Sequence, residues 1–208
     1  MKVGTDGTLL GAWARGGNCI LDVGTGTGLI ALMMAQRFPE ARVTGIDIDP
    51  EAIQQAAQNV AASPFAASVT VHRAAVQQFA EGCYDAIVCN PPFFIDALAS
   101  PDRQRTLARH THTLTYDALM KATARLLTDD GECSVVVPFD YRSRMEAAAV
   151  LAGLSPARVC AVRTTPTKSP RRYLLSFRKK PAMNVENTEI VIGSEAYQQL
   201  LKDFYLKY

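Results

Sequence analysis

The stretch Asn90-Pro91-Pro92-Phe93 combines groups that can hold a planar amino group. The Asn90 side-chain oxygen and the Pro91 carbonyl can both accept hydrogen bonds from such a group, and the Phe93 ring can stack on the base or amide that carries it. The stretch follows the apolar run 86–89, which predicts a strand, so it lies at a strand's carboxyl end. Open α/β sheets bind their ligands at these ends. The motif therefore predicts a catalytic site that methylates nitrogen.

A second candidate site is the glycine-rich turn Asp22-Val23-Gly24-Thr25-Gly26-Thr27-Gly28, placed between a predicted strand and a predicted helix. Glycines at Gly24, Gly26 and Gly28 allow the backbone to approach a ligand closely. The spacing is Gly-x-Gly-x-Gly, unlike the dinucleotide motif, and the Asp22 carboxylate would repel a pyrophosphate. It suits a cationic amino group, bound directly or through water, such as that of S-adenosylmethionine.

A second acidic position follows about 20 residues later, the offset at which Rossmann-like folds place a ribose-binding carboxylate. Asp47 ends the second predicted strand and is our expected ribose ligand, with Ile48 beside it. Asp49 is better explained as the N-cap of a helix that has Pro50 at its first position. Each feature alone also occurs in proteins without a cofactor, but the glycine-rich turn, the acid and the Asn-Pro-Pro-Phe motif together predict a cofactor site.

The elements that must position these residues alternate along the chain, since short β-rich apolar runs are separated by Ala-rich helical stretches. This pattern predicts an α/β, Rossmann-like fold, with a mostly parallel seven-stranded sheet, helices on both faces and an antiparallel hairpin at one end. The predicted strands are 19–23, 42–46, 68–72, 84–89, 132–137, 155–163 and 173–178, and the predicted helices are 29–37, 50–62, 116–127 and 141–151.

The composition limits the class of protein. With 208 residues, 48% of them hydrophobic, the chain can bury one substantial core, so we expect one domain over residues 1–180. Residues 181–208 are expected to add a strand and an amphipathic helix that pack on that domain. The five cysteines lack the spacing of a metal site or a disulfide framework. We find no signal peptide and no apolar run of about 18 residues, so we expect a cytoplasmic protein without a membrane partner.

Together these residues resemble the class I S-adenosylmethionine-dependent methyltransferases. The blocks 1–13 and 171–177 more closely resemble the bacterial tRNA(Val) adenine-37 N6-methyltransferase family. The resemblance implies methyl transfer to the N6 amine of an adenine in a tRNA anticodon loop, with S-adenosylhomocysteine as product and no metal. It places Thr5 and Asp6 beside the methionine end of the cofactor, and Ala75 and Val76 beside its adenine.

Two departures from the family pattern accompany the resemblance. Ala75 stands where relatives usually carry an aspartate that binds the cofactor's adenine amino group, so we expect weakened cofactor binding. Relatives usually have residues ahead of the 1–13 block, so an element that helps cover the substrate is expected to be absent. The Asn-Pro-Pro motif also fits ribosomal-RNA guanine-N2 and protein glutamine-N5 methyltransferases. A catalytically weak RNA-binding module is a further alternative.

Charge placement supports an RNA partner. Formal net charge is only +2, but basic residues cluster in the loop after the Asn-Pro-Pro-Phe motif and between 163 and 180. We expect phosphate contacts from five of them, namely Arg105, Arg109, Lys168, Arg171 and Arg172. The alternative is a solvated basic face without a ligand. The sequence leaves the oligomeric state open, and we favour a monomer.

Overall fold

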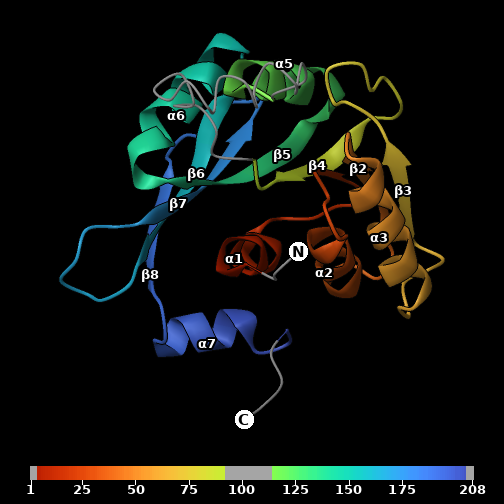
Figure 1. Cartoon of the computed structure of the whole chain (residues 1–208). Helices are drawn as coiled ribbons and strands as arrows, with labels where there is room; N and C mark the ends of the chain where they lie inside the picture. Colours follow the sequence, from red (N-terminus) through yellow and green to blue (C-terminus); the bar gives the residue numbers. More distant parts are fainter. Residues whose placement is uncertain (1–3, 92–113, 205–208) are drawn as a thin grey trace, which may run out of the picture.

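The computed structural model describes residues 4–91 and 114–204. Within them one eight-stranded sheet runs through the molecule in the order β3-β2-β1-β4-β5-β7-β6-β8 (Figure 1). Every neighbouring pair is parallel except the two that involve β7. The strands are β1 (Cys19–Val23), β2 (Arg42–Asp47), β3 (Val69–Arg73), β4 (Tyr84–Cys89), β5 (Leu127–Pro138), β6 (Ser155–Arg163), β7 (Arg172–Arg178) and β8 (Glu186–Val191).

The predicted fold class is confirmed, but the count of seven strands is wrong. The eighth strand is β8, which pairs in parallel with β6 at the edge of the sheet. The sequence predicts a short strand in the C-terminal extension but does not place it in the sheet. Strand pairing depends on an edge that is formed far away in sequence, so a local pattern cannot reveal it.

Helices cover both faces of the sheet, with α5 and α6 on one face and α1, α2 and α3 on the other (Figure 1). Helix α7 packs next to α1, with Leu201 fully buried. The helices are α1 (Thr5–Trp13), α2 (Leu29–Arg37), α3 (Pro50–Ala61), α5 (Tyr116–Leu126), α6 (Arg142–Leu151) and α7 (Glu195–Leu201), and η2 (Phe139–Tyr141) is a short 3-10 turn. No helix in the described ranges is long and apolar enough to span a bilayer.

Local sequence signals explain where several helices begin. The Asp49 carboxylate accepts a hydrogen bond from the Glu51 backbone N–H at 2.9 Å, which confirms the predicted N-cap of α3. The Thr115 hydroxyl accepts one from the Ala118 N–H at 3.2 Å and caps α5. These caps fix the first residue of two helices that pack on the sheet, α3 after β2 and α5 before β5.

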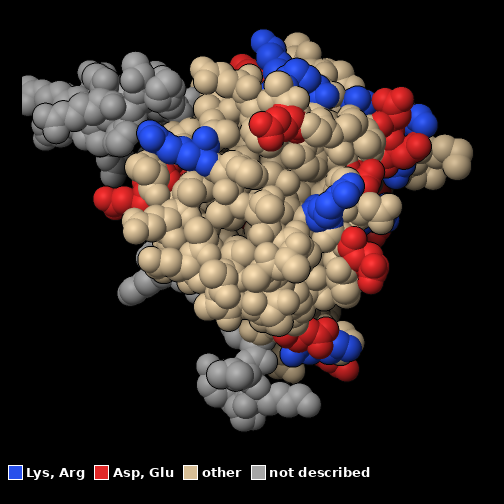
Figure 2. All heavy atoms as spheres, turned by 90° about the vertical axis from the view of Figure 1, so that its right-hand side faces the viewer, with Lys and Arg blue, Asp and Glu red and all other residues tan. Residues whose placement is uncertain are grey.

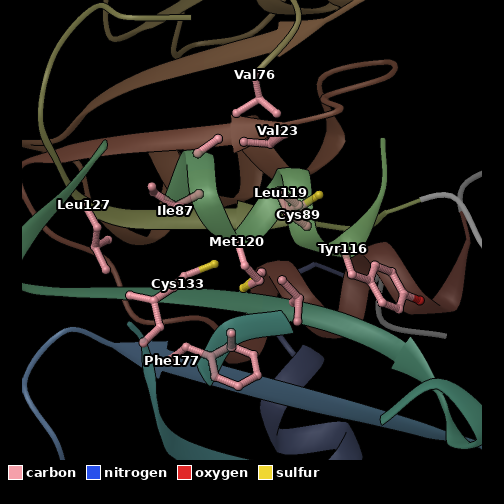
Figure 3. Close-up of a cluster of buried hydrophobic side chains, with 14 of the residues drawn as sticks. Val23, Val76, Ile87, Cys89, Tyr116, Leu119, Met120, Leu127, Cys133 and Phe177 are labelled. Carbon is pink, nitrogen blue, oxygen red and sulfur yellow. The ribbon is translucent and has the colours of Figure 1, made fainter. Parts of the chain in front are cut away.

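The core consists of two clusters, one on each face of the sheet. Figure 3 shows the cluster under α5 and α6, where Ile87, Leu119, Met120 and Phe177 are buried to 1% exposure or less. Full burial of such a side chain stabilises the fold by about 1.5–3 kcal/mol. The other cluster joins α1, α2 and α7 to the opposite face. Two packed faces leave the strand ends as the place for a ligand.

A buried ion pair anchors the end of α1 to the sheet. The Arg158 Nε and Nη2 atoms donate to Glu132 Oε1 at 2.9 and 2.6 Å, and both side chains are less than 10% exposed. The Arg158 guanidinium also lies 3.8 Å from the centre of the Trp13 ring. This contact joins β5, β6 and the last residue of α1, and so holds the N-terminal helix beside the strands.

Candidate active site

The glycine-rich turn leaves β1 and enters α2 through three left-handed glycines. Gly24, Gly26 and Gly28 have φ values of 71°, 56° and 82°, a region that other residues adopt only at a cost. The Gly24 and Thr25 N–H groups donate to the Ile46 carbonyl at 2.8 and 3.0 Å, which fixes the turn against β2. A side chain at Gly24 would project into open space, so the absence of one exposes the backbone to a ligand.

Asp22 lies beneath this turn and is fully buried. Its Oδ2 atom accepts hydrogen bonds from the Thr25 hydroxyl at 2.7 Å and the Ala31 N–H at 3.1 Å. Its Oδ1 atom has no hydrogen-bond partner within the described residues. Burial raises the pKa of Asp22 from 3.8 to about 7; the two hydrogen bonds oppose the rise and the nearby Asp47 charge adds to it. In this conformation Asp22 supports the turn and makes no direct contact with the cavity described below.

Asp47 ends β2 and connects the two cofactor-side segments. Its Oδ2 atom accepts a hydrogen bond from the Gly26 N–H at 2.9 Å, and its Oδ1 atom accepts one from the Asp49 N–H at 3.0 Å. Each carboxylate oxygen can accept a further bond, so both remain able to receive a ribose hydroxyl. The carboxylate is thus already oriented by the backbone before any ligand binds.

A cavity of about 570 Å³ opens at the carboxyl ends of β1, β2 and β4. Its volume is within the range typical of small-molecule sites. Six of the predicted site residues line it, namely Gly24, Gly26, Asp47, Ile48, Val76 and Asn90. Other lining residues came from the structure alone, among them Ala52, Ala74, Cys89 and Leu114. Leu114 itself was not among the residues predicted at the site. Gln77 also lines the cavity, whereas Ala75, expected beside the cofactor's adenine, does not.

Asn90 reaches the cavity because of strand register. Cys89, the last residue of β4, pairs with Val23, the last residue of β1, so Asn90 and Gly24 leave neighbouring strands at the same level. Asn90 is half-buried and Pro91 is buried. Pro92 and Phe93 lie outside the described residues. The Asn90 amide, which we expect to hold the amino group that is methylated, therefore lines the same cavity as the glycine-rich turn and Asp47.

The segment after β3 is held over the cavity by α5. The Arg125 guanidinium donates to the Phe79 carbonyl at 2.8 Å and to the Val76 carbonyl at 3.1 Å. These bonds fix the backbone on both sides of Gln77, on the side of the cavity where the resemblance places the adenine.

Thr5 and Asp6 begin α1, and neither lines the cavity. The Asp6 carboxylate accepts a charge-assisted hydrogen bond from Arg172 Nε at 2.8 Å, across 166 positions of sequence. One residue expected at the cofactor and one expected at RNA are thus bound to each other. The pair joins α1 to the start of β7.

The basic residues separate into two groups. Lys168 and Arg171 are exposed in the connection between β6 and β7, at the same edge as the cavity. Lys179 and Lys180 lie past the other end of β7 and pair with Asp129 and Asp130 at 3.5 and 2.7 Å. The basic residues that cluster between 163 and 180 in the sequence therefore lie at opposite ends of β7. Arg105 and Arg109 lie outside the described residues.

Charge on a different face is mixed. Figure 2 views the molecule from the side of α3 and β3, where basic and acidic side chains are interspersed on a largely uncharged surface. The part of this face that the structure describes carries no broad basic patch. In residues 4–91 and 114–204, no group of three or more His, Cys, Asp or Glu side chains is placed to hold a metal ion.

Comparison with known proteins identifies the class first. Residues 9–150 match the family model described as "Methyltransferase small domain", so fold and sequence together define a methyltransferase. A solved structure from Agrobacterium tumefaciens, described as a predicted O-methyltransferase, superposes with a TM-score of 0.71 over 96% of this chain and 94% of that one. Its sequence is only 18% identical, so it shows the shared fold alone.

The particular family follows from closer relatives. A tRNA1(Val) (adenine(37)-N6)-methyltransferase from Parabacteroides distasonis is 43% identical over 218 residues, which cover 100% of this chain and 92% of the relative. A protein of the same name from Vibrio campbellii is 41% identical over 217 residues, covering 100% and 90%. The chain belongs to this family of methyltransferases, which confirms the resemblance read from the sequence.

Proposed function

We propose that this protein transfers a methyl group from S-adenosylmethionine to the exocyclic N6 amine of an adenine in tRNA, with adenine 37 of tRNA(Val) as the target. The observation that carries the proposal is the position of Asn90, which lines the same cavity as the glycine-rich turn and Asp47. An amide acceptor for the substrate amine and a cofactor-binding turn thus open into one space. The names of the relatives supply the target.

The residues of the cavity fit the cofactor. Asp47 would receive the ribose hydroxyls, and Ile48, Val76 and Gln77, which also line the cavity, would surround the adenine. The exposed backbone at Gly24 would meet the methionine end, and Asp22 would support that backbone from beneath through Thr25 and Ala31. Bound here, S-adenosylmethionine supplies an electrophilic methyl group on its sulfonium sulfur.

Asn90 and the Pro91 carbonyl orient the acceptor by receiving hydrogen bonds from the two N6 protons. These bonds raise electron density on a nitrogen whose lone pair is otherwise delocalised into the ring. In the transfer that bound S-adenosylmethionine would allow, the N6 lone pair would form the new N–C bond as the S–C bond breaks, the S–C bonding electrons would remain on sulfur, and one N6 proton would pass to solvent. Alignment of the reacting atoms supplies much of the remaining rate, so no strong base is required.

We assign the phosphate contacts of the tRNA to Lys168 and Arg171. Both side chains are exposed at the ends of the strands that hold the cavity. Phosphate contacts give affinity without sequence preference, whereas the target adenine must leave its stack to enter the cavity. Recognition of the anticodon loop by its shape is consistent with this division of roles.

The proposal is tested with Asn90→Ala and with Asn187→Ala, a matched control at an exposed position of β8. Cofactor binding is measured by calorimetry and methyl transfer to unmodified tRNA with labelled S-adenosylmethionine. We expect Asn90→Ala to bind cofactor like the wild type and to lose most turnover, with the control unchanged. Equal loss of binding and turnover in Asn90→Ala would overturn the assigned role, and the absence of transfer to any tRNA by the wild type would overturn the proposed substrate.

A further inference from the structure

An aromatic pair stands exposed at the sheet edge that holds the cavity. Phe139 follows directly after β5, and Tyr173 is the second residue of β7. Their ring centres are 6.0 Å apart with an interplanar angle of 27°, a stacked arrangement. Phe139 is nevertheless 47% exposed. The stack therefore presents an oriented aromatic surface to solvent.

Backbone contacts and packing fix this surface in place. The Phe139 N–H donates to the Arg171 carbonyl at 3.2 Å, which ties the turn after β5 to the connection before β7. Tyr173 pairs with Val137 across the two strands and packs against the core cluster. A ring held in this way loses little conformational freedom when a ligand stacks on it.

Several arginines lie around the rings, together with acidic residues. The Arg142 guanidinium lies 4.7 Å from the centre of the Tyr173 ring and pairs with Glu146 at 2.8 Å. The exposed Arg171 is held beside Phe139 by the hydrogen bond from the Phe139 N–H to the Arg171 carbonyl. Asp140 is an exposed acid next to Phe139 in sequence. A similar contact occurs at Tyr141, the next aromatic residue along the chain. The Arg144 guanidinium lies 5.6 Å from the centre of the Tyr141 ring. Aromatic rings interleaved with arginines are typical of surfaces that bind unpaired nucleic acid.

The distance from the predicted catalytic amide suits a nucleotide near the target. Cys89 in β4 pairs with Val135 in β5, so Phe139, the first residue after β5, lies three residues beyond the level of Asn90. At the rise of a strand, three residues correspond to about 10 Å along the strand direction. A base stacked on Phe139 would then belong to a nucleotide close to the one that enters the cavity.

We propose that Phe139, supported by Tyr173, is a stacking platform for an unpaired base that flanks the target adenine in the RNA. This inference rests on the proposed function, since it requires an RNA substrate. The platform separates two tasks: Asn90 orients the amine that reacts, whereas Phe139 holds a neighbouring base and so keeps the loop open. Stacking tolerates every base, so the platform contributes affinity and register more than sequence preference.

The test compares Phe139→Ala, Phe139→Trp and the control Leu151→Ala, which removes an apolar side chain that is 81% exposed at the end of α6. RNA affinity is measured by fluorescence anisotropy with an anticodon stem-loop, independently of turnover, and cofactor affinity by calorimetry. We expect Phe139→Ala to weaken RNA binding about 5- to 150-fold, the range expected for loss of one base–aromatic stack. Phe139→Trp and Leu151→Ala should bind RNA within twofold of wild type, and cofactor affinity should not change.

A second series replaces single nucleotides beside the target adenine by abasic residues. At the position whose base stacks on Phe139, wild type should lose the same factor in affinity that Phe139→Ala loses, and Phe139→Ala should lose nothing more. RNA affinity of Phe139→Ala within twofold of wild type would overturn the platform. It would also be overturned if, at every position tested, an abasic residue weakened binding by the same factor in wild type and in Phe139→Ala. Failure of wild type to bind any stem-loop would instead overturn the proposed RNA substrate.

Discussion

Asp22 gives the fold a dependence on pH that can be measured without any ligand. Its side chain is fully buried, and burial raises its pKa from 3.8 to about 7. Each tenfold change in proton affinity is worth about 1.4 kcal/mol, so ionising Asp22 in the folded protein costs about 4 kcal/mol more than ionising it in the unfolded chain. The stability of the folded state is therefore greatest when Asp22 is protonated.

The sign of the effect follows from the raised pKa. Stability associated with Asp22 is fully present below the pKa of the unfolded chain and is lost as the pH rises through about 7. Between pH 5 and pH 8 this loss amounts to about 3 kcal/mol. Asp22→Asn keeps the size of the side chain and the oxygen that accepts from Thr25 and Ala31, but it removes the charge.

The assay is denaturant unfolding of wild type and Asp22→Asn at several values between pH 5 and pH 8, with no cofactor added. The free energy of unfolding of wild type should fall by about 3 kcal/mol more than that of the variant over this range. For a chain of this length, thermal midpoints should separate by roughly 2–4 °C per kcal/mol. Parallel pH profiles would refute the reasoning, because they would mean that Asp22 pays no burial penalty for its charge.

Three further changes test other parts of the structure. Gly45→Ala places a methyl group 2.8 Å from the Thr25 hydroxyl oxygen, so we expect a displaced glycine-rich turn and at least tenfold weaker cofactor binding by calorimetry; unchanged affinity would argue against this close packing. Among the residues that the structure describes, Arg158→Ala leaves the buried Glu132 with Arg15 at 3.6 Å as its remaining cationic partner, and the change should lower the free energy of unfolding by about 3–5 kcal/mol. Lys168→Ala should reduce the slope of log affinity for tRNA against log salt by about 0.7–0.9, the change expected for one phosphate contact; an unchanged slope would remove Lys168 from the interface.

The sequence predicted the parts of the site that depend on local order. Gly24 and Asp47 each end or follow an apolar run, and parallel strands bring their carboxyl ends together beside the cavity. Asn90 follows the same rule. Asp22 was expected at the cofactor too, but it lies buried beneath the turn and does not line the cavity. The bounds of β1 and β4 agree with the predicted ranges because these strands are central and mostly apolar.

Features that depend on contacts distant in sequence could not be predicted. The Asp6–Arg172 pair joins residues 166 positions apart; the family resemblance assigns Asp6 to the cofactor, and the charge pattern assigns Arg172 to RNA. The sequence shows one basic cluster between 163 and 180, but β7 carries its two halves to opposite ends of the sheet. Side-chain partners and sheet edges are set by tertiary packing, which leaves no short-range signal.

The central claim is that this cavity methylates the N6 amine of adenine in tRNA. The most direct measurement is nucleoside mass spectrometry of unmodified tRNA(Val) after incubation with the wild-type protein and labelled S-adenosylmethionine, with Asn90→Ala in parallel. The account predicts labelled N6-methyladenosine at position 37 in the wild-type reaction and its loss in Asn90→Ala. Labelled N2-methylguanosine, or transfer only to a protein glutamine, would contradict it.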